Sequence, residues 1–194
     1  MKLVFATNNQ HKLQEIKHLL GNSIELLSLK EIGCFEDIPE NQPTIEGNAA
    51  EKSFYVYNNY GYNCFADDTG LEIEALNSEP GVFSARYAGE EKSAEKNMAL
   101  VLQKLNKIKD RKARFKTVIS LLIGGREIQF DGIVDGEILE EKRGATGFGY
   151  DPIFKPEESR LSFAEMSLDE KNKISHRGRA TQKLIEYLTH LDTE

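Results

Sequence analysis

Residues 114–138 read RFKTVISLLIGGREIQFDGIVDGEI, and this stretch decides the fold predicted for the 194-residue chain. Two runs rich in β-branched and aromatic residues, 114–123 and 127–138, flank Gly124-Gly125, a dipeptide suited to a tight hairpin turn. We therefore expect one long antiparallel pair of strands. Helical and strand-like segments intermix around this pair, which predicts a mixed α/β fold.

The segments on either side of the hairpin supply the other elements. The predicted elements are strands at 2–6, 24–29 and 64–67 and helices at 11–20, 45–60, 92–108 and 175–191. Thr44 is a candidate N-cap of the helix at 45–60, and Ser167-Leu168-Asp169-Glu170 fits a capping box. Because the sequence contains no linker or repeat, residues 1–194 are predicted to form a single domain with two lobes.

Composition and charge limit the class of partner. Hydrophobic residues make up 39% of the chain and charged residues 29%, and the net charge is −7. We therefore expect a globular cytoplasmic protein that binds nucleic acid and anionic membranes poorly. The apolar stretch at 3–6 is too short for a signal peptide, and no apolar run approaches the length of a membrane span. Cys34 and Cys64 are expected to be buried thiols rather than a disulfide.

The first candidate site joins the N-terminal strand to the first helix, and it reads Thr7-Asn8-Asn9-Gln10-His11-Lys12. N–H groups at the start of a helix attract anions, and Lys12 in the first turn adds a positive charge. The alternative is an ordinary strand–helix turn in which an asparagine caps the helix.

The second candidate is Asp67-Asp68-Thr69-Gly70, placed where the predicted strand 64–67 ends. Carboxylates that follow a strand suit Mg²⁺ binding or general-base catalysis. Because neighbouring strand residues point to opposite faces, one of the two aspartates is expected to face a given ligand. A polar β-turn explains the same residues without any chemistry.

Asn48 and Lys52 share one side of the predicted helix 45–60, because they lie four residues apart. A lysine at the edge of an apolar face usually extends its ammonium to solvent, so we interpret Lys52 as a surface residue. Glu40 and Glu46 lie just upstream and could join Asp68 on a metal ion, although acidic loops are commonly solvated surface.

Two segments near the C-terminus could recognise a base. In 144–152, GATGFGYDP, glycines let the backbone approach a ligand and Phe148 offers a ring for stacking; the alternative is a glycine-rich turn with packed aromatic residues. Ser175-His176-Arg177-Gly178-Arg179 opens the last helix, and its histidine and arginine donate hydrogen bonds that suit the keto oxygens of a purine. Considered singly, such histidines and arginines are more often surface residues.

Together these segments resemble the inosine triphosphate pyrophosphatase family, in particular the bacterial dITP/XTP pyrophosphatases. The matching motifs are Ala6-Thr7-Asn8-Asn9 through Lys12, Thr44 through Asn48-Ala49, Ala66-Asp67-Asp68-Thr69-Gly70-Leu71, PGVFSARYAG at 80–89, GFGYDPIF at 147–154, and Ser175-His176-Arg177-Gly178. The resemblance covers nearly the whole chain. It implies a long mixed sheet with two α/β lobes flanking a central active-site cleft, usually in a homodimer.

The resemblance also implies a role for individual residues. Asp68 is implied as the catalytic residue, and Asp68 and Glu40 as the ligands of Mg²⁺. The implied substrate-binding residues are Thr7, Asn8, Asn9, Gln10, His11 and Lys12 for the triphosphate, Thr69 for phosphate, Phe148, Gly149, Tyr150 and Asp151 for the base, Lys171, and His176 and Arg177 for the purine 6-oxygen.

The predicted reaction is hydrolysis of ITP, dITP or XTP to the nucleoside monophosphate and pyrophosphate, with Mg²⁺ offsetting the charge of the triphosphate. Donors aimed at a keto oxygen disfavour a 6-amino purine, because a buried donor would stay unpaired. Asp68 acts as metal ligand, as base, or as both. Two alternatives are a pyrophosphatase for other nucleotides and a non-catalytic nucleotide-binding regulator. Asp68 together with Lys12 favours catalysis, since a pure binder needs no carboxylate beside phosphates.

Overall fold

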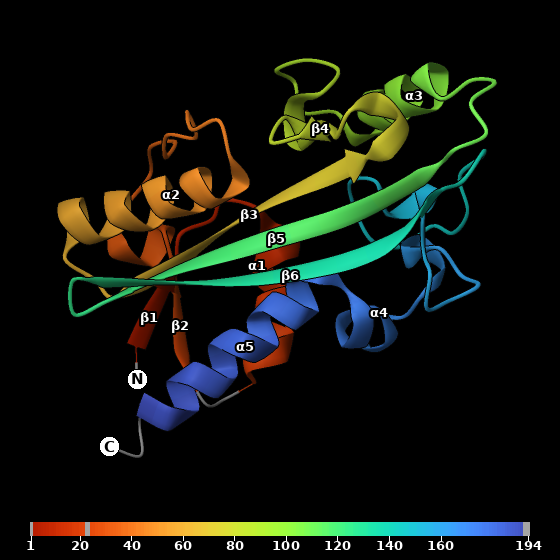
Figure 1. The fold of residues 1–194 in the computed structure, drawn as a ribbon. Coiled ribbons are helices and arrows are strands. Elements are labelled where there is room, and N and C mark those ends of the chain that lie inside the picture. The colour runs from red at the N-terminus through yellow and green to blue at the C-terminus, as the bar shows by residue number, and fades with distance from the viewer. Residues whose placement is uncertain (1, 22–23, 192–194) are drawn as a thin grey trace. The chain divides into compact units, whose positions relative to one another are not determined.

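The computed structural model describes residues 2–21 and 24–191 (Figure 1). The strands are β1 (Lys2–Phe5), β2 (Glu25–Ser28), β3 (Cys64–Ile73), β4 (Glu79–Gly81), β5 (Lys112–Ile123), β6 (Arg126–Ile138) and β7 (Phe154–Pro156). The α-helices are α1 (Gln10–Leu20), α2 (Ile45–Tyr60), α3 (Ala94–Lys104), α4 (Leu168–Ile174) and α5 (His176–Leu191). This mixture confirms the predicted α/β class.

The strands form one seven-stranded mixed sheet in the order β2-β1-β3-β5-β6-β7, with β4 paired to β3. β1 runs parallel to β2 and β3, whereas the pairs β3–β4 and β6–β7 are antiparallel. The predicted hairpin is confirmed, because Gly124 and Gly125 connect β5 to β6. Their φ angles of 56° and 77° lie in the left-handed region that a tight two-residue hairpin turn requires.

The chain divides into two compact units, and the division falls inside β3, β5 and β6. Unit 1 comprises Met1–Asp68, Thr117–Gly132 and Gly178–Glu194. Unit 2 comprises Thr69–Lys116 and Ile133–Arg177. Each unit has a hydrophobic core of its own.

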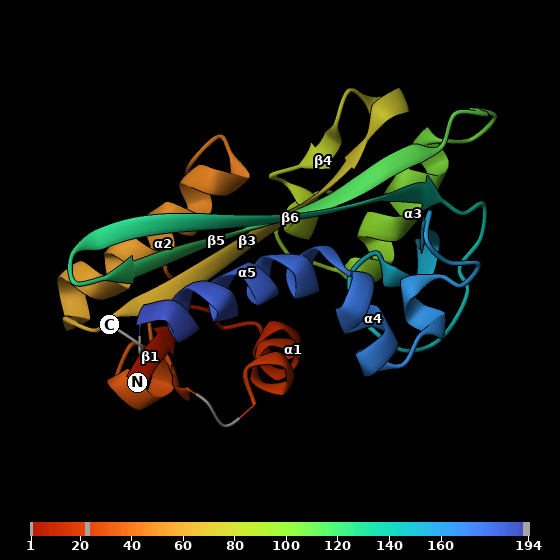
Figure 2. The ribbon, with the colours of Figure 1, turned by 60° about the horizontal axis from the view of Figure 1, so that its bottom comes forward.

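In unit 1, the alternation of strand residues sends side chains to two faces of the sheet. The odd-numbered core residues pack with α1 and α5: Leu3, Phe5, Phe65, Ile119 and Leu121. The even-numbered core residues pack with Val56 of α2: Val4, Ala6, Cys64, Ala66 and Leu122. Figure 2 shows α2 on one side of these strands and α1 and α5 on the other. Within unit 1, the parity of a β3 residue therefore decides which helix it meets.

The core of unit 2 is built on aromatic rings. Phe154 packs edge-on against Phe115, with centroids 4.7 Å apart, and its ring lies 5.3 Å from that of Phe163. α3 adds Met98 and Val101 to this core. The capping box predicted at the start of α4 is confirmed, since the Ser167 and Glu170 side chains each bond the other's backbone N–H.

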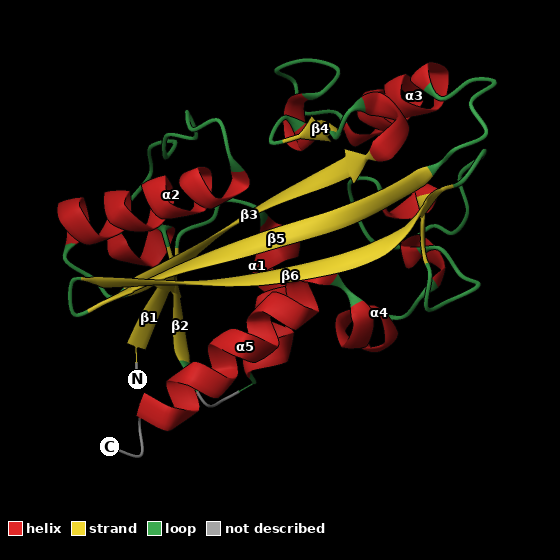
Figure 3. Cartoon of the chain, in the orientation of Figure 1, coloured by secondary structure: helices red, strands yellow, loops and turns green. Residues whose placement is uncertain are grey.

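The predicted bounds of two elements are wrong. β3 does not end at Asp67 but continues to Ile73 as one strand (Figure 3), because β1 pairs with its first residues and β4 with its last three. The Asp67–Gly70 segment is therefore neither a strand end nor a β-turn. α3 is shorter than the predicted 92–108, because Lys92 and Lys107 have φ angles of 52° and 65°, which a helix excludes.

The two cysteines are free and buried, as predicted. Burial raises the pKa of the Cys64 thiol to about 12, so this thiol stays protonated at neutral pH. Among residues 2–21 and 24–191, no helix combines the length and the apolar character that crossing a membrane requires.

Candidate functional site

Asp67 and Asp68 are consecutive residues of β3, so their side chains leave opposite faces of the sheet. The wholly buried carboxylate of Asp67 accepts a hydrogen bond from Nζ of Lys12, on α1, at 3.0 Å. Asp68 Oδ2 accepts one from Nδ2 of Asn48, on α2, at 3.2 Å, and its Oδ1 lies 3.9 Å from Nζ of Lys52. Each aspartate thus meets the helix that covers its own face.

Lys52 lies at the centre of this acidic cluster. It is 6% exposed, and its ammonium donates to Glu40 Oε1 at 2.5 Å and to the backbone oxygen of Asp67 at 2.7 Å. Burial lowers the pKa of Lys52, but the charges of Asp68, Glu40 and Asp67 outweigh burial and raise it, so the lysine stays charged. The interpretation of Lys52 as a surface residue is wrong, because carboxylates rather than water satisfy its charge.

The Asp68 carboxylate has the properties of a proton acceptor or metal ligand. Burial raises its pKa, and the positive charges of Lys52 and Lys12 offset part of this effect. Asp68 and Glu40 also share one ammonium, so their oxygens converge.

These oxygens fit a hard cation such as Mg²⁺. In the described part of the chain, no three His, Cys, Asp or Glu side chains group closely enough to hold a metal ion by themselves. A cation bound by Asp68 and Glu40 would complete its coordination with oxygens of a ligand and with water. Mg²⁺ is commonly held in this way, by one or two carboxylates and the phosphates of a substrate.

The segment Thr7–Lys12 connects β1 to α1, and Asn9 caps the helix. Asn9 Oδ1 accepts hydrogen bonds from the backbone N–H groups of His11 and Lys12 at 3.0 and 3.2 Å. The alternative that an asparagine caps the helix is therefore confirmed. The Asn9 side chain already accepts from two of the backbone N–H groups that were considered for anion binding. Asn8, Gln10 and His11 are exposed, whereas the Lys12 ammonium lies against Asp67.

In unit 2, Asp151 organises the glycine-rich loop. Its Oδ2 accepts hydrogen bonds from the backbone N–H of Phe148 at 2.8 Å and from Nζ of Lys171 at 2.7 Å. Nζ of Lys171 and Cζ of Arg177 lie 4.8 and 5.5 Å from the centre of the Phe148 ring. An aromatic ring with two cations within cation–π range lies at the centre of this group.

The structure buries His176 and Arg177, which excludes the alternative that they are surface residues. The His176 ring stacks on Phe115 with centroids 4.5 Å apart. Arg177 is 2% exposed, and its Nη2 donates to Oγ1 of Thr69 at 3.1 Å. Partners from the aromatic core and from β3 thus hold both side chains inside the protein.

Tyr150 takes a different position from Phe148. Its hydroxyl donates to the backbone oxygen of Ser84 at 2.7 Å, and burial raises its pKa. The Tyr150 side chain thus belongs to the core of unit 2. A ligand at this loop would meet Phe148 and the backbone of Gly149 and Tyr150.

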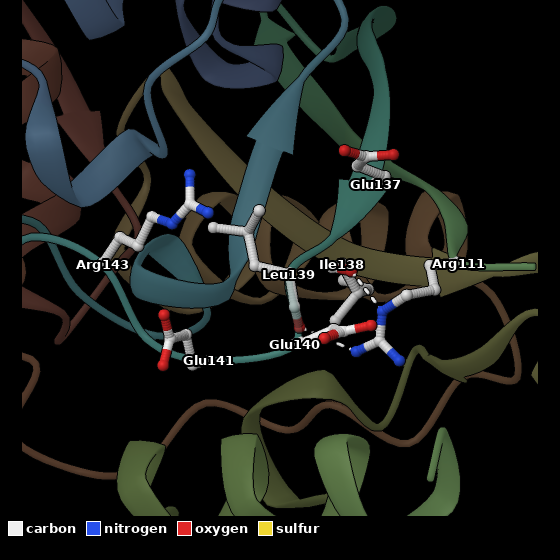
Figure 4. Close-up of a pocket in the computed structure, with 7 residues that line it drawn as sticks. All are labelled: Arg111, Glu137, Ile138, Leu139, Glu140, Glu141 and Arg143. Atoms are coloured by element: carbon white, nitrogen blue, oxygen red, sulfur yellow. Dashed lines mark hydrogen bonds between the residues drawn. The ribbon is translucent and has the colours of Figure 1, made fainter. Parts of the chain in front are cut away.

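A pocket of about 590 Å³ in unit 2 is lined by Arg111, Glu137, Ile138, Leu139, Glu140, Glu141 and Arg143 (Figure 4). Arg111 donates to the backbone oxygens of Leu105, Ile138 and Leu139 at 3.2, 2.6 and 2.7 Å. These hydrogen bonds from the Arg111 guanidinium fix the backbone at the end of β6. None of the predicted site residues lines this pocket, so we assign no substrate to it.

The predicted site residues are divided between the two units. Unit 1 holds Thr7, Asn8, Asn9, Gln10, His11, Lys12, Glu40 and Asp68, and unit 2 holds Thr69, Phe148, Gly149, Tyr150, Asp151, Lys171, His176 and Arg177. Asn48, Lys52 and Asp67 belong to candidate segments of the sequence, but no catalytic or binding role was predicted for them. The available signal was the four-residue spacing of Asn48 and Lys52 on an otherwise apolar face.

Known proteins resemble the chain along nearly its whole length. Residues 3–187 match the model of the Ham1 family. The proteins named dITP/XTP pyrophosphatase from Flavobacterium johnsoniae and Porphyromonas gingivalis are 59% and 52% identical to it; the matches cover 97% and 96% of this chain and 98% and 97% of those proteins. Structures of Ham1 proteins from Staphylococcus aureus and Coxiella burnetii match with TM-scores of 0.89 and 0.90 at 39% identity, covering 98% of this chain and 99% of theirs. The chain belongs to the Ham1 family.

Gly147 is a sensitive position in the loop of unit 2. Its φ is 76°, and a Cβ there would lie 2.2 Å from Oδ2 of Asp151. We expect Gly147→Ala to displace this carboxylate from Lys171 and from the backbone of Phe148. Gly149→Ala is the matched control, because φ is 63° and nothing lies within 4 Å of its added Cβ.

Both variants bear left-handed strain of about 1–2 kcal/mol, but Gly147→Ala adds the cost of overpacking, about 1–3 kcal/mol. Its thermal midpoint should therefore lie roughly 2–12 °C below that of Gly149→Ala. Equal midpoints in calorimetry would show that Asp151 is not fixed as described.

Proposed function

We propose that this protein hydrolyses non-canonical purine nucleoside triphosphates, namely dITP, XTP and ITP, to the nucleoside monophosphate and pyrophosphate. The observation that carries this proposal is the match to proteins named dITP/XTP pyrophosphatase over nearly the full chain, at up to 59% identity. The acidic cluster around Lys52 supports it, because such a cluster suits a reaction at phosphates.

Asp68 and Glu40 are proposed to hold Mg²⁺. The bound ion supplies the positive charge that a chain of net charge −7 needs in order to accept a triphosphate. Lys52 keeps the two carboxylates converged, and Asp68 takes the proton of the water that attacks between the α- and β-phosphates. Thr7 to Lys12, at the start of α1, are proposed to bind phosphate oxygens through donors other than the two amides that Asn9 caps.

The group in unit 2 is proposed to select the base. Phe148 stacks on the purine, while His176 and Arg177 donate to its 6-oxygen. Asp151 keeps Lys171 and the loop in place, and Thr69 contributes a hydroxyl to phosphate. A guanidinium only donates, so a 6-amino purine leaves donors facing donors and is disfavoured.

Two further parts of the proposal concern the oligomeric state of the protein and its location in the cell. We propose a homodimer, which a molar mass of one chain by light scattering at micromolar concentration would contradict. We also propose a cytoplasmic location, because the proposed substrates belong to the nucleotide pool.

Asp68→Asn tests the proposed chemistry, because it removes the base and the anionic ligand at nearly constant volume. We expect the turnover of dITP to fall by at least about 100-fold, as measured by Mg²⁺-dependent pyrophosphate release. Asp131→Asn is the matched control in unit 1, since Asp131 pairs with Lys183 on the surface. If Asp68→Asn turned over within a few-fold of the wild type, the assignment of Asp68 would be wrong.

Arg177→Ala tests base selection. The ratio of kcat/KM for ITP to that for ATP should fall at least about tenfold, the equivalent of one good donor contact of ~1.4 kcal/mol. Because both substrates meet the same enzyme, partial unfolding cancels from this ratio. Arg179→Ala, two residues further along α5, is the control and should leave the ratio unchanged. An unchanged ratio in Arg177→Ala would assign Arg177 to a structural role.

A further inference from the structure

Asn48 makes two side-chain hydrogen bonds to different parts of unit 1. Its Oδ1 accepts from the backbone N–H of Gln42 at 2.9 Å, and its Nδ2 donates to Asp68 Oδ2 at 3.2 Å. The residue is buried, with 2% of its surface exposed. One amide group therefore joins the segment that carries Glu40 to the carboxylate of Asp68.

The orientation of the Asn48 amide follows from chemistry. A backbone N–H can only donate, so the atom that faces Gln42 must be the amide oxygen. The NH₂ group consequently faces Asp68, where Oδ2 must act as an acceptor. The two oxygens of Asp68 thereby receive different partners: Oδ2 is committed to Asn48, and Oδ1 lies on the side of Lys52.

The segment that carries Glu40 is fixed to α2 at further points. The backbone N–H of Asn41 donates to Oε2 of Glu51 at 2.8 Å, and Tyr55 donates its hydroxyl to Glu36 at 2.9 Å. These contacts hold the segment, and Asn48 links it to β3 as well. The placement of Glu40 relative to Asp68 thus depends on the Asn48 amide and on the ammonium of Lys52.

We propose that Asn48 is a positioning residue of the active site. It sets the placement of Glu40 relative to Asp68, and its hydrogen bond occupies Oδ2 of Asp68, which leaves Oδ1 for the proposed reaction. This inference rests on the proposed roles of Glu40 and Asp68. It assigns Asn48 no contact with substrate. Partners of this kind, behind the groups that touch a metal ion, typically change affinity or activity by about 10- to 100-fold.

Two variants separate the two hydrogen bonds. Asn48→Ala removes both, whereas Asn48→Asp keeps an acceptor for Gln42 and loses the donor to Asp68. In both we expect kcat for dITP to fall about tenfold or more, with a smaller change in KM, and in Asn48→Ala we expect the half-saturating Mg²⁺ concentration to rise about tenfold. If Asn48→Ala does not fold, Asn48→Asp still tests whether the hydrogen bond from Asn48 Nδ2 to Asp68 matters for turnover.

A second readout is independent of activity. Hydrogen exchange of the Gln42 amide, measured without metal, should be slow in the wild type and in Asn48→Asp and faster in Asn48→Ala. This result would stand even if the protein hydrolysed no nucleotide, so failure of the inference is distinguishable from failure of the proposed function. If the Gln42 amide exchanged at the wild-type rate in Asn48→Ala, Asn48 would not hold the segment that carries Glu40.

Asn97→Ala is the matched control, because Asn97 is an equally buried asparagine of unit 2. Its side chain accepts from the backbone N–H of Ala88 at 2.7 Å and donates to the backbone oxygen of Ala85 at 2.9 Å. We expect this variant to lose thermal stability without a shift in the half-saturating Mg²⁺ concentration. The inference is overturned if Asn48→Asp keeps the wild-type kcat, or if Asn48→Ala shows only the stability loss of this control.

Discussion

A buried ammonium among carboxylates is the constraint on which the acidic cluster of unit 1 depends. Removing Lys52 from water is unfavourable unless charges and hydrogen bonds replace its hydration. Glu40 and the backbone of Asp67 supply those bonds, and Asp68 adds its charge at 3.9 Å. In return, Lys52 screens the repulsion that would drive the carboxylates apart. The acidic oxygens are therefore brought together by the fold itself, at the place where the proposed reaction needs them.

β3 supplies consecutive residues with different partners. Asp67 bonds Lys12 of α1, Asp68 bonds Asn48 of α2, and Thr69 accepts from Arg177. In unit 1 this distribution follows from the two-residue period of a strand that is covered by helices on both faces. A one-residue slip in the register of β3 would exchange the two aspartates between the faces, so the pairing with β1 is part of the site.

Local signals in the sequence predicted most elements of the fold. The Gly-Gly turn located the hairpin. The structure confirms Thr44 as the N-cap of α2 and the capping box that begins at Ser167. Burial of polar residues was harder to predict, because it depends on partners distant in sequence. Lys52, His176 and Arg177 all look like surface residues until Glu40, Phe115 and Thr69 are placed beside them. The course of β3 through Asp67–Gly70 was missed for a similar reason, since the strands on either side of β3 in the sheet, β1 and β5, are distant from it in sequence.

The most direct test of this account is the thermal midpoint of Lys52→Met at neutral pH. Loss of one partner of a buried ion pair costs about 3–5 kcal/mol, and Glu40, with 31% of its side chain exposed, can recover some hydration. The account predicts a midpoint at least about 5 °C below that of the wild type, and a partial recovery on adding Mg²⁺. Lys183→Met, which breaks the exposed pair with Asp131, should cost about 0–1 kcal/mol. Equal midpoints for the two variants would contradict the central role of Lys52.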